Sequence, residues 1–306
     1  MPTATAKKFK DAYFTSLDDA VWCVEKLSEL INLKDKIALE PAAGSGVFLR
    51  ASKKSGLVWV TNELYPEFAQ GYEADFSLDF GKADLSELGR FDVVLTNPPF
   101  GGSNMLARKF VKRSLEISDT VAMLLPRGCR RGTTIDKDIP DDVEIIFDED
   151  PPNGTFDLPD GTTRSIGCVF MVFQRKKGYS RGLLCEYEPE GYGVQKVCVA
   201  KKGRKDFTGW CPGWATHGLC VWGSAGSFFD CTRKDPFAEQ LLFRFTDEQA
   251  EVVKKIDWDA AQERSRTSVP RLVDPEVFTV INRALREAGV VVDESLSSYK
   301  PKAIVL

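Results

Sequence analysis

The segment Asn97-Pro98-Pro99-Phe100 follows an apolar run at residues 91–96 and combines hydrogen-bond acceptors with a flat ring. Two consecutive prolines fix the backbone and remove two N–H donors, so the carbonyl groups of Asn97 and Pro98 can face outward. The Asn97 side-chain oxygen and the Pro98 carbonyl then form a pair of acceptors for an exocyclic NH₂ group. Phe100 offers an apolar face to the ring that carries this group. The motif predicts a socket for a planar amine.

A second candidate site is the turn that follows the apolar run at residues 36–40. Glu40 ends this run, and a turn containing Gly44 and Gly46 leads from it into a helical pattern. Such a turn lets the backbone approach a bound nucleoside closely. A dinucleotide-binding fold would carry a third glycine where Leu49 stands, so the pattern disfavours NAD.

Glu63 ends the next apolar run, residues 57–63, and lies 23 residues after Glu40. A carboxylate at this position can accept two hydrogen bonds from the vicinal hydroxyl groups of a ribose, and an offset of about 20 residues is typical of nucleotide-binding sheets. We expect Glu63 to hold a ribose.

Short strands that alternate with helices must position these residues. The apolar runs that predict strands are residues 36–40, 57–63, 91–96, 120–125, 143–147 and 166–173. Apolar residues at helical spacing predict a helix over residues 17–31, with Ser16 or Asp18 as its cap. Because the runs are apolar on both faces, we expect a mostly parallel sheet covered by helices.

The composition changes beyond residue 174. Glycine, tryptophan and cysteine gather between residues 178 and 231, and helical patterns follow at residues 246–256 and 275–289. We place a domain boundary near residues 177–180, which gives a first domain at 1–178 and an accessory or substrate-recognition region of unknown fold at 179–306. The cysteines form no Cys-x₂-Cys or Cys-x₂-His pair, so no metal site is expected.

Charge is distributed unevenly along the chain. The totals of 41 basic and 45 acidic residues give a net charge of −4, so overall charge does not draw the protein to nucleic acid. Residues 101–131 carry a net +5 and residues 174–205 a net +6, which favours a polyanionic substrate at these places. Residues 132–160 contain ten acidic residues and one lysine, and we expect them to form an exposed flap that repels phosphate.

The 306 residues contain no apolar run approaching the roughly 18 residues of a membrane span, and the first ten residues are polar. We therefore expect a cytoplasmic protein without a membrane partner. The sequence leaves the oligomeric state open, and a monomer is compatible with it.

The two motifs together resemble those of a known family. Residues 40–46 and Asn97-Pro98-Pro99-Phe100 are similar to class I S-adenosylmethionine-dependent amino-methyltransferases, chiefly the N6-adenine enzymes that act on DNA or RNA. Residues 12–16 resemble the Phe-Thr-Pro segment of the γ-type arrangement, with Ser16 in place of the proline. The resemblance covers residues 12–176. It implies a Rossmann-like α/β fold with a seven-stranded methyltransferase sheet, in which residues 166–173 form an antiparallel edge strand.

The resemblance also implies a cofactor, S-adenosylmethionine, and residues that hold it. Its methionine half would lie on Thr15, Glu40 and the glycine turn, its ribose on Glu63, and its adenine amino group on Asp75, with Asp84 as the alternative. The implied cofactor residues are Thr15, Glu40, Ala42, Gly44, Gly46, Glu63, Asp75 and Asp84.

The implied reaction is direct transfer of a methyl group to a neutral amine, with Asn97, Pro98, Pro99 and Phe100 as the catalytic residues. The acceptor would be the N6 amino group of adenine in nucleic acid, with DNA ahead of RNA. One alternative is N5-methylation of glutamine in a protein, because enzymes of that kind use a similar socket. Another is a non-catalytic nucleic-acid-binding protein on a methyltransferase fold.

Overall fold

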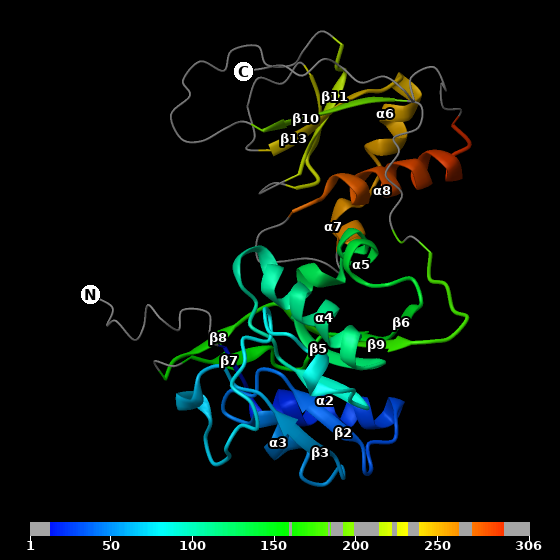
Figure 1. Ribbon diagram of the computed structural model, residues 1–306. Coiled ribbons are helices and arrows are strands. Elements are labelled where there is room, and N and C mark those ends of the chain that lie inside the picture. The colour runs from blue at the N-terminus through cyan, green and yellow to red at the C-terminus, as the bar shows by residue number, and fades with distance from the viewer. Residues whose placement is uncertain are drawn as a thin grey trace. The chain divides into compact units, whose positions relative to one another are not determined.

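Figure 1 shows a computed structural model of the chain. It describes residues 13–158, 161–182, 184, 192–198, 214–221, 225–231, 239–262 and 271–290. The chain divides into two compact units, residues 1–182 and 183–306, whereas the sequence analysis placed the boundary at 178. The lysine-rich cluster at residues 201–205 lies outside the described residues.

A six-stranded sheet forms the centre of the first unit (Figure 1). Its order is β3 (Val58–Thr61), β2 (Ile37–Glu40), β4 (Val93–Thr96), β5 (Thr120–Pro126), β9 (Cys168–Arg175) and β6 (Val143–Glu149). Neighbours among the first four strands are parallel, and β9 is antiparallel to both β5 and β6. Each strand overlaps an apolar run that predicted it.

The antiparallel strand is not at the sheet edge, where the sequence analysis placed it. β9 lies between β5 and β6, and its first six residues are buried. β6 takes the edge instead and carries the acidic residues Glu144, Asp148 and Glu149. This order follows from composition, because a strand that is apolar on both faces needs neighbours, whereas a charged strand tolerates an edge.

The expected seventh strand is reduced to one parallel bridge between Asn62 and Phe76, so within residues 13–158 and 161–182 the main sheet has six strands. Side chains replace the missing ladder. Asp75 accepts hydrogen bonds from the N–H of Thr61 at 2.7 Å and from its hydroxyl at 2.9 Å. The Leu78 N–H donates to the Asn62 side chain at 2.8 Å.

Helices cover both faces of the sheet. Figure 1 shows α2 (Leu17–Leu30) and α3 (Val47–Ala51) together on one side, and α4 (Met105–Ile117) and α5 (Gly132–Asp138) on the other. The Ser16 side chain caps α2 by accepting from the Asp19 N–H at 3.2 Å. This cap is one of the two that the sequence offered.

A small antiparallel sheet holds the chain segment ahead of α2. Its order is β1 (Phe14–Thr15), β7 (Thr155–Asp157) and β8 (Thr163–Ser165). The fully buried Asp19 of α2 accepts hydrogen bonds from the backbone of Asn153 at 3.1 Å and of Thr155 at 3.3 Å. Asp19 thereby fixes the turn from which β7 starts.

The acidic segment is not an exposed flap, because its carboxylates pair with basic side chains. Asp138 binds Arg108 and Lys112, and Arg130 binds Asp148 and Asp150. Further pairs join Arg127 to Asp150, Arg175 to Asp142, Lys176 to Glu144 and Arg181 to Asp136. The excess positive charge of residues 101–131 is thus largely offset within the unit.

The second unit has its own core. Its antiparallel sheet has the order β10 (Gly193–Cys198), β13 (Glu239–Arg244), β11 (His217–Cys220) and β12 (Phe228–Asp230). Its helices are α6 (Asp247–Val253), α7 (Trp258–Gln262) and α8 (Asp274–Glu287). The buried Tyr192 hydroxyl donates to Asn282 at 2.7 Å. None of the helices in the described parts of the chain is long and apolar enough to cross a membrane.

Candidate active site

The carboxyl ends of β2 and β4 bring the two sequence motifs together. They lie at the edge of the sheet that is formed by the ends of its parallel strands, not by its outermost strand. Glu40 is the last residue of β2 and Thr96 the last of β4, and the strands are parallel neighbours. β1 crosses this edge, because the Tyr13 carbonyl accepts from Asn97 and the Phe14 ring lies against Gly44. Three segments distant in the sequence therefore converge here.

Glu40 is a buried carboxyl group in this edge, with 1% of its surface exposed. Burial raises its pKa to about 8, and the charge of Glu63 acts in the same direction. The Ala42 N–H, 3.4 Å from the carboxylate, opposes the rise. The Thr96 hydroxyl also favours the charged form by its proximity, although it does not reach hydrogen-bond geometry. Glu40 is thus held mostly neutral at pH 7, and a cation beside it would favour its ionisation.

Glu63 is bound to the glycine turn rather than free at a strand end. Its two oxygens accept from the Gly44 N–H at 2.7 Å and from the Tyr65 N–H at 2.8 Å. Burial raises the pKa of this carboxyl, and the two N–H groups oppose the rise. Each carboxylate oxygen has a second lone pair, so the ribose-binding role predicted from the sequence stays chemically possible.

Two aromatic rings that the sequence analysis did not place at the site lie on the glycines. A Cβ at Gly44 would lie 3.2 Å from the Phe14 ring, and one at Gly46 would lie 3.0 Å from the Tyr72 ring. Both glycines also have positive φ angles, 51° and 71°. In this structure the close approach that requires glycine is therefore made by the protein's own rings.

The Asn97 amide is oriented by the backbone of the crossing segment. Its Nδ2 donates to the Tyr13 carbonyl at 3.0 Å. A carbonyl can only accept, so this bond decides which end of the amide is the oxygen. The Oδ1 atom is buried, and no described residue forms a hydrogen bond with it. The acceptor predicted from the sequence is thus present and unsatisfied.

Phe100 is 8% exposed and one face of its ring is covered. The Tyr13 ring stacks on it with centroids 5.9 Å apart and planes inclined by 21°. The buried Phe156 ring meets Phe100 edge-on at 6.1 Å and Tyr13 at 6.2 Å. Pro98 is buried and Pro99 half-buried beside this group. The flat face that the sequence offered to an acceptor is occupied here by Tyr13.

The turn between Phe100 and α4 holds unusual backbone conformations. Gly101, Ser103 and Asn104 have φ angles of 67°, 54° and 61°. For residues other than glycine this region is costly, and such residues gather at functional sites. The strain lies directly after the amine-socket motif.

The structure separates the two candidates for the cofactor's adenine amino group. Asp75 lies beside Thr61, the last residue of β3, which donates two hydrogen bonds to one oxygen of its carboxylate. Asp84 lines a pocket of about 500 Å³ together with Arg90, Arg113 and Ile117. Arg90 precedes β4 and Ile117 precedes β5, so this pocket lies at the amino ends of these strands, whereas Asn97 follows the carboxyl end of β4.

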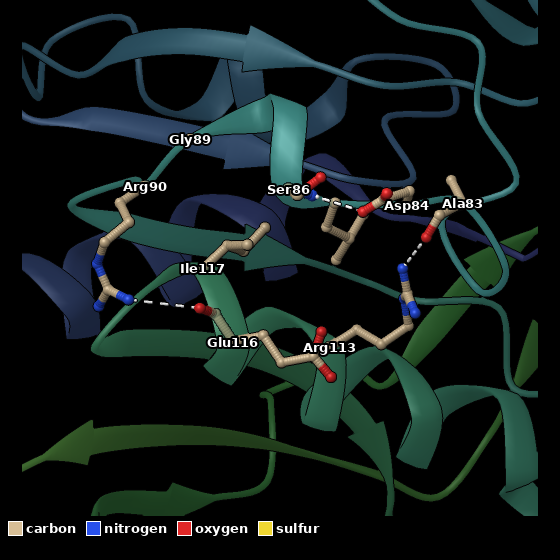
Figure 2. A pocket seen from close by; sticks show the side chains of 9 residues that line it. Ala83, Asp84, Ser86, Gly89, Arg90, Arg113, Glu116 and Ile117 are labelled. Atoms are coloured by element: carbon tan, nitrogen blue, oxygen red, sulfur yellow. Dashed lines mark hydrogen bonds between the residues drawn. The ribbon is translucent and has the colours of Figure 1, made fainter.

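Figure 2 shows that the polar groups of this pocket are bound to one another. Asp84 accepts from the Ser86 N–H at 2.9 Å, Arg90 reaches the Glu116 carbonyl, and Arg113 reaches the Ala83 carbonyl. Asp84 therefore stabilises a local turn in this structure, and it stays the alternative to Asp75.

Buried polar atoms that form no hydrogen bond with any described residue make this edge suitable for a polar, cationic cofactor. Three buried polar atoms at this edge have no hydrogen-bond partner within the described residues, namely Thr15 Oγ1, Thr96 Oγ1 and Asn97 Oδ1. Buried polar groups are normally satisfied, so their clustering points to a ligand that would complete them. A cation bound beside Glu40 and Glu63 would favour the ionised form of both carboxyl groups, whose pKa values burial raises.

Neither a protein-family model nor a curated protein sequence matches the chain. Solved structures resemble it in fold. The methyltransferase subunit of a type I restriction-modification system from Streptococcus thermophilus is 15% identical, with a TM-score of 0.41, over 55% of this chain and 46% of that one. Magnesium protoporphyrin IX methyltransferase from Synechocystis PCC 6803 is 14% identical, with a TM-score of 0.38, over 52% of this chain and 78% of that one. Both likenesses are at low identity and with TM-scores below 0.5, and they leave the substrate undetermined.

Proposed function

We propose that the chain is an S-adenosylmethionine-dependent methyltransferase that methylates a planar amine, the N6 amino group of adenine in nucleic acid. The observation that carries the proposal is the buried, unpartnered Asn97 Oδ1 beside the stacked rings of Tyr13 and Phe100. An acceptor atom without a donor next to an aromatic face suits a heterocycle that carries an NH₂ group.

Cofactor binding would use the edge formed by β1, β2 and β3. Thr15, Glu40 and the Gly44–Gly46 turn would hold the methionine half, Glu63 the ribose and Asp75 the adenine. When bound, S-adenosylmethionine supplies a methyl group on a positively charged sulfur. The acceptor socket would bind and orient the amine that receives this methyl group.

At the socket, Asn97 Oδ1 and the Pro98 carbonyl each accept a hydrogen bond from one N–H group of the amine. The nitrogen lone pair of an aryl amine is conjugated with its ring, and these two bonds favour a pyramidal nitrogen whose lone pair faces the methyl donor. The amine nitrogen would take up the methyl carbon as it leaves the sulfur of the cofactor, and would then release one proton to water. Catalysis is alignment and electrostatic stabilisation without a shifted general base. The base would stack on Phe100 where Tyr13 lies now, and a base in a duplex would first leave its stack.

The decisive variant is Asn97→Ala. We expect it to abolish methyl transfer while leaving S-adenosylmethionine binding nearly unchanged, because Asn97 contacts the acceptor. The assay follows a radiolabelled methyl group into mixed DNA and RNA, with mass spectrometry of the nucleosides, and calorimetry measures the cofactor. Asn32→Ala, an exposed asparagine on the surface, is the matched control. Unchanged turnover of Asn97→Ala would eliminate the mechanism.

The ion pairs of the first unit favour a second candidate, N5-methylation of a glutamine side chain in a protein. Basic charge was the reason to prefer a nucleic acid, and much of that charge pairs with Asp138, Asp148 and Asp150. A glutamine amide presents the same NH₂ group but no ring for Phe100. Competition between oligonucleotides and a glutamine-containing protein separates the two. A chain without affinity for S-adenosylmethionine would instead support the non-catalytic alternative.

A further inference from the structure

Both backbone polar groups of Gly44, its N–H and its carbonyl, are bound by side chains from outside the turn. Its N–H donates to Glu63 at 2.7 Å, and its carbonyl accepts from the Tyr72 hydroxyl at 2.8 Å. Glu63 belongs to the end of β3, whereas Tyr72 comes from the segment that follows it, 28 residues from Gly44. The two side chains fix one residue of the turn in a positive-φ conformation.

The Tyr72 ring adds a second contact to the same turn. It lies so close to Gly46 that a Cβ there would be 3.0 Å from two of its carbons. The side chain is half-buried, and burial together with the charges of Glu63 and Glu40 raises the pKa of its hydroxyl. Tyr72 therefore stays neutral and remains a hydrogen-bond donor at physiological pH.

The position of Tyr72 places it at the cofactor end of the site rather than at the acceptor end. Its contacts are Gly44, Gly46 and the neighbourhood of the two buried carboxyl groups, whereas Asn97 contacts Tyr13. Loss of a Tyr72 contact should therefore act on one ligand and not on the other.

We propose that Tyr72 is a positioning residue of the cofactor site, which holds the glycine turn in its binding shape through the Gly44 carbonyl and closes the turn with its ring at Gly46. This inference rests on the proposed function, because it assumes that the turn binds S-adenosylmethionine. It assigns the hydroxyl and the ring separate contributions, which two substitutions can separate.

The test compares Tyr72→Phe and Tyr72→Ala with the wild-type protein, with Tyr179→Phe as a control at a tyrosine remote from the turn. Calorimetry measures the Kd for S-adenosylmethionine and for S-adenosylhomocysteine. We expect Tyr72→Phe to weaken both about fivefold, as loss of one neutral hydrogen bond does. Because Gly44 and Tyr72 are only half-buried, water can replace the hydroxyl in the ligand-free protein, so its thermal midpoint should change little. Tyr72→Ala should weaken both further, and Tyr179→Phe should match the wild type.

In turnover, the KM for the methyl donor should rise in Tyr72→Phe while kcat at saturation and the KM for the acceptor stay unchanged. A merely structural residue would lower the folded fraction and affect both substrates alike. Equal Kd values for Tyr72→Phe and wild type, or a fall in binding matched by a fall in thermal midpoint, would overturn the inference alone. A wild-type protein that binds neither ligand would overturn the proposed function and this inference together.

Discussion

Glu40 is a carboxyl group whose burial should make the stability of the ligand-free protein depend on pH. Its pKa is about 8 in the folded chain against an ordinary value of 4.5. Between these values the unfolded chain has lost the proton that the folded chain keeps, so the free energy of unfolding falls as pH rises. Each unit of the difference is worth about 1.4 kcal/mol.

Chemical denaturation between pH 5 and pH 9 measures this effect. Glu63 also has a raised pKa and adds a slope of the same sign, so the comparison is with Glu40→Gln, which removes only the Glu40 contribution. We expect the wild-type curve to fall more steeply than the variant curve and to run parallel to it above pH 8. Parallel curves across the whole range would contradict the burial of a neutral Glu40.

At this scale the sequence predicted the residues that belong to local motifs and missed those that act through long-range contacts. Asn97 and Glu63 could be recognised from the strands that precede them. Tyr13 orients Asn97 from 84 residues away, and Tyr72 reaches Gly44 from 28 residues away. Tyr13 lies in the segment 12–16 that resembles a family motif, but nothing local shows that it orients Asn97, and no local pattern marks Tyr72.

Among the elements, Asp19 joins α2 to the start of β7, and β7 pairs with β1. A substitution of Asp19 therefore tests how much this contact contributes to holding β1. Asp19→Ala would remove a fully buried carboxylate and leave the backbone N–H groups of Asn153 and Thr155 without this acceptor. We expect the free energy of unfolding to fall by about 2–3 kcal/mol, the usual cost of losing hydrogen bonds to a charged group.

The neighbouring Asp18→Ala is the control for this prediction, because Asp18 is exposed in the first turn of the same helix. It should cost at most about 1 kcal/mol, since only its interaction with the helix dipole is lost. Denaturant titration of both variants measures the difference, and equal losses would show that the contact between α2 and the start of β7 contributes little.

The strands of the main sheet could be predicted from the hydrophobic pattern of the sequence, except that an expected seventh strand is absent from the described part of the first unit. The six strands could be predicted because each is a short apolar run. The seventh was expected from the resemblance alone, and residues 64–90 have no such run. There Asp75 and Asn62 supply by side chains the hydrogen bonds that a strand would supply by backbone. The edge position of β6 also depends on pairing, which the run at residues 143–147 does not specify.

For the molecule as a whole, pairing of opposite charges should limit binding to polyanions through the first unit. Asp150 neutralises Arg127 and Arg130. We expect Asp150→Asn to strengthen non-specific binding of a short DNA duplex and to steepen the plot of log K against log salt by about one unit, as one added phosphate contact would.

Fluorescence anisotropy at several salt concentrations measures that slope. Asp35→Asn changes the net charge equally, but Asp35 is exposed and precedes β2, whereas Arg127 follows the carboxyl end of β5, so this variant should leave the slope unchanged. Identical slopes for the two variants would mean that the arginines do not meet the duplex even when one counter-charge is removed.

The insertion of β9 between β5 and β6 also determines when the sheet can be completed during synthesis. β6 leaves the ribosome before β9, and among the described strands it pairs with β9 alone, so it has no partner in this sheet until residue 175 has emerged. Until then β5, every residue of which is buried in the finished fold, presents an unpaired apolar edge. Nascent chains that pause before residue 168 should therefore be the form most prone to aggregate and most dependent on chaperones.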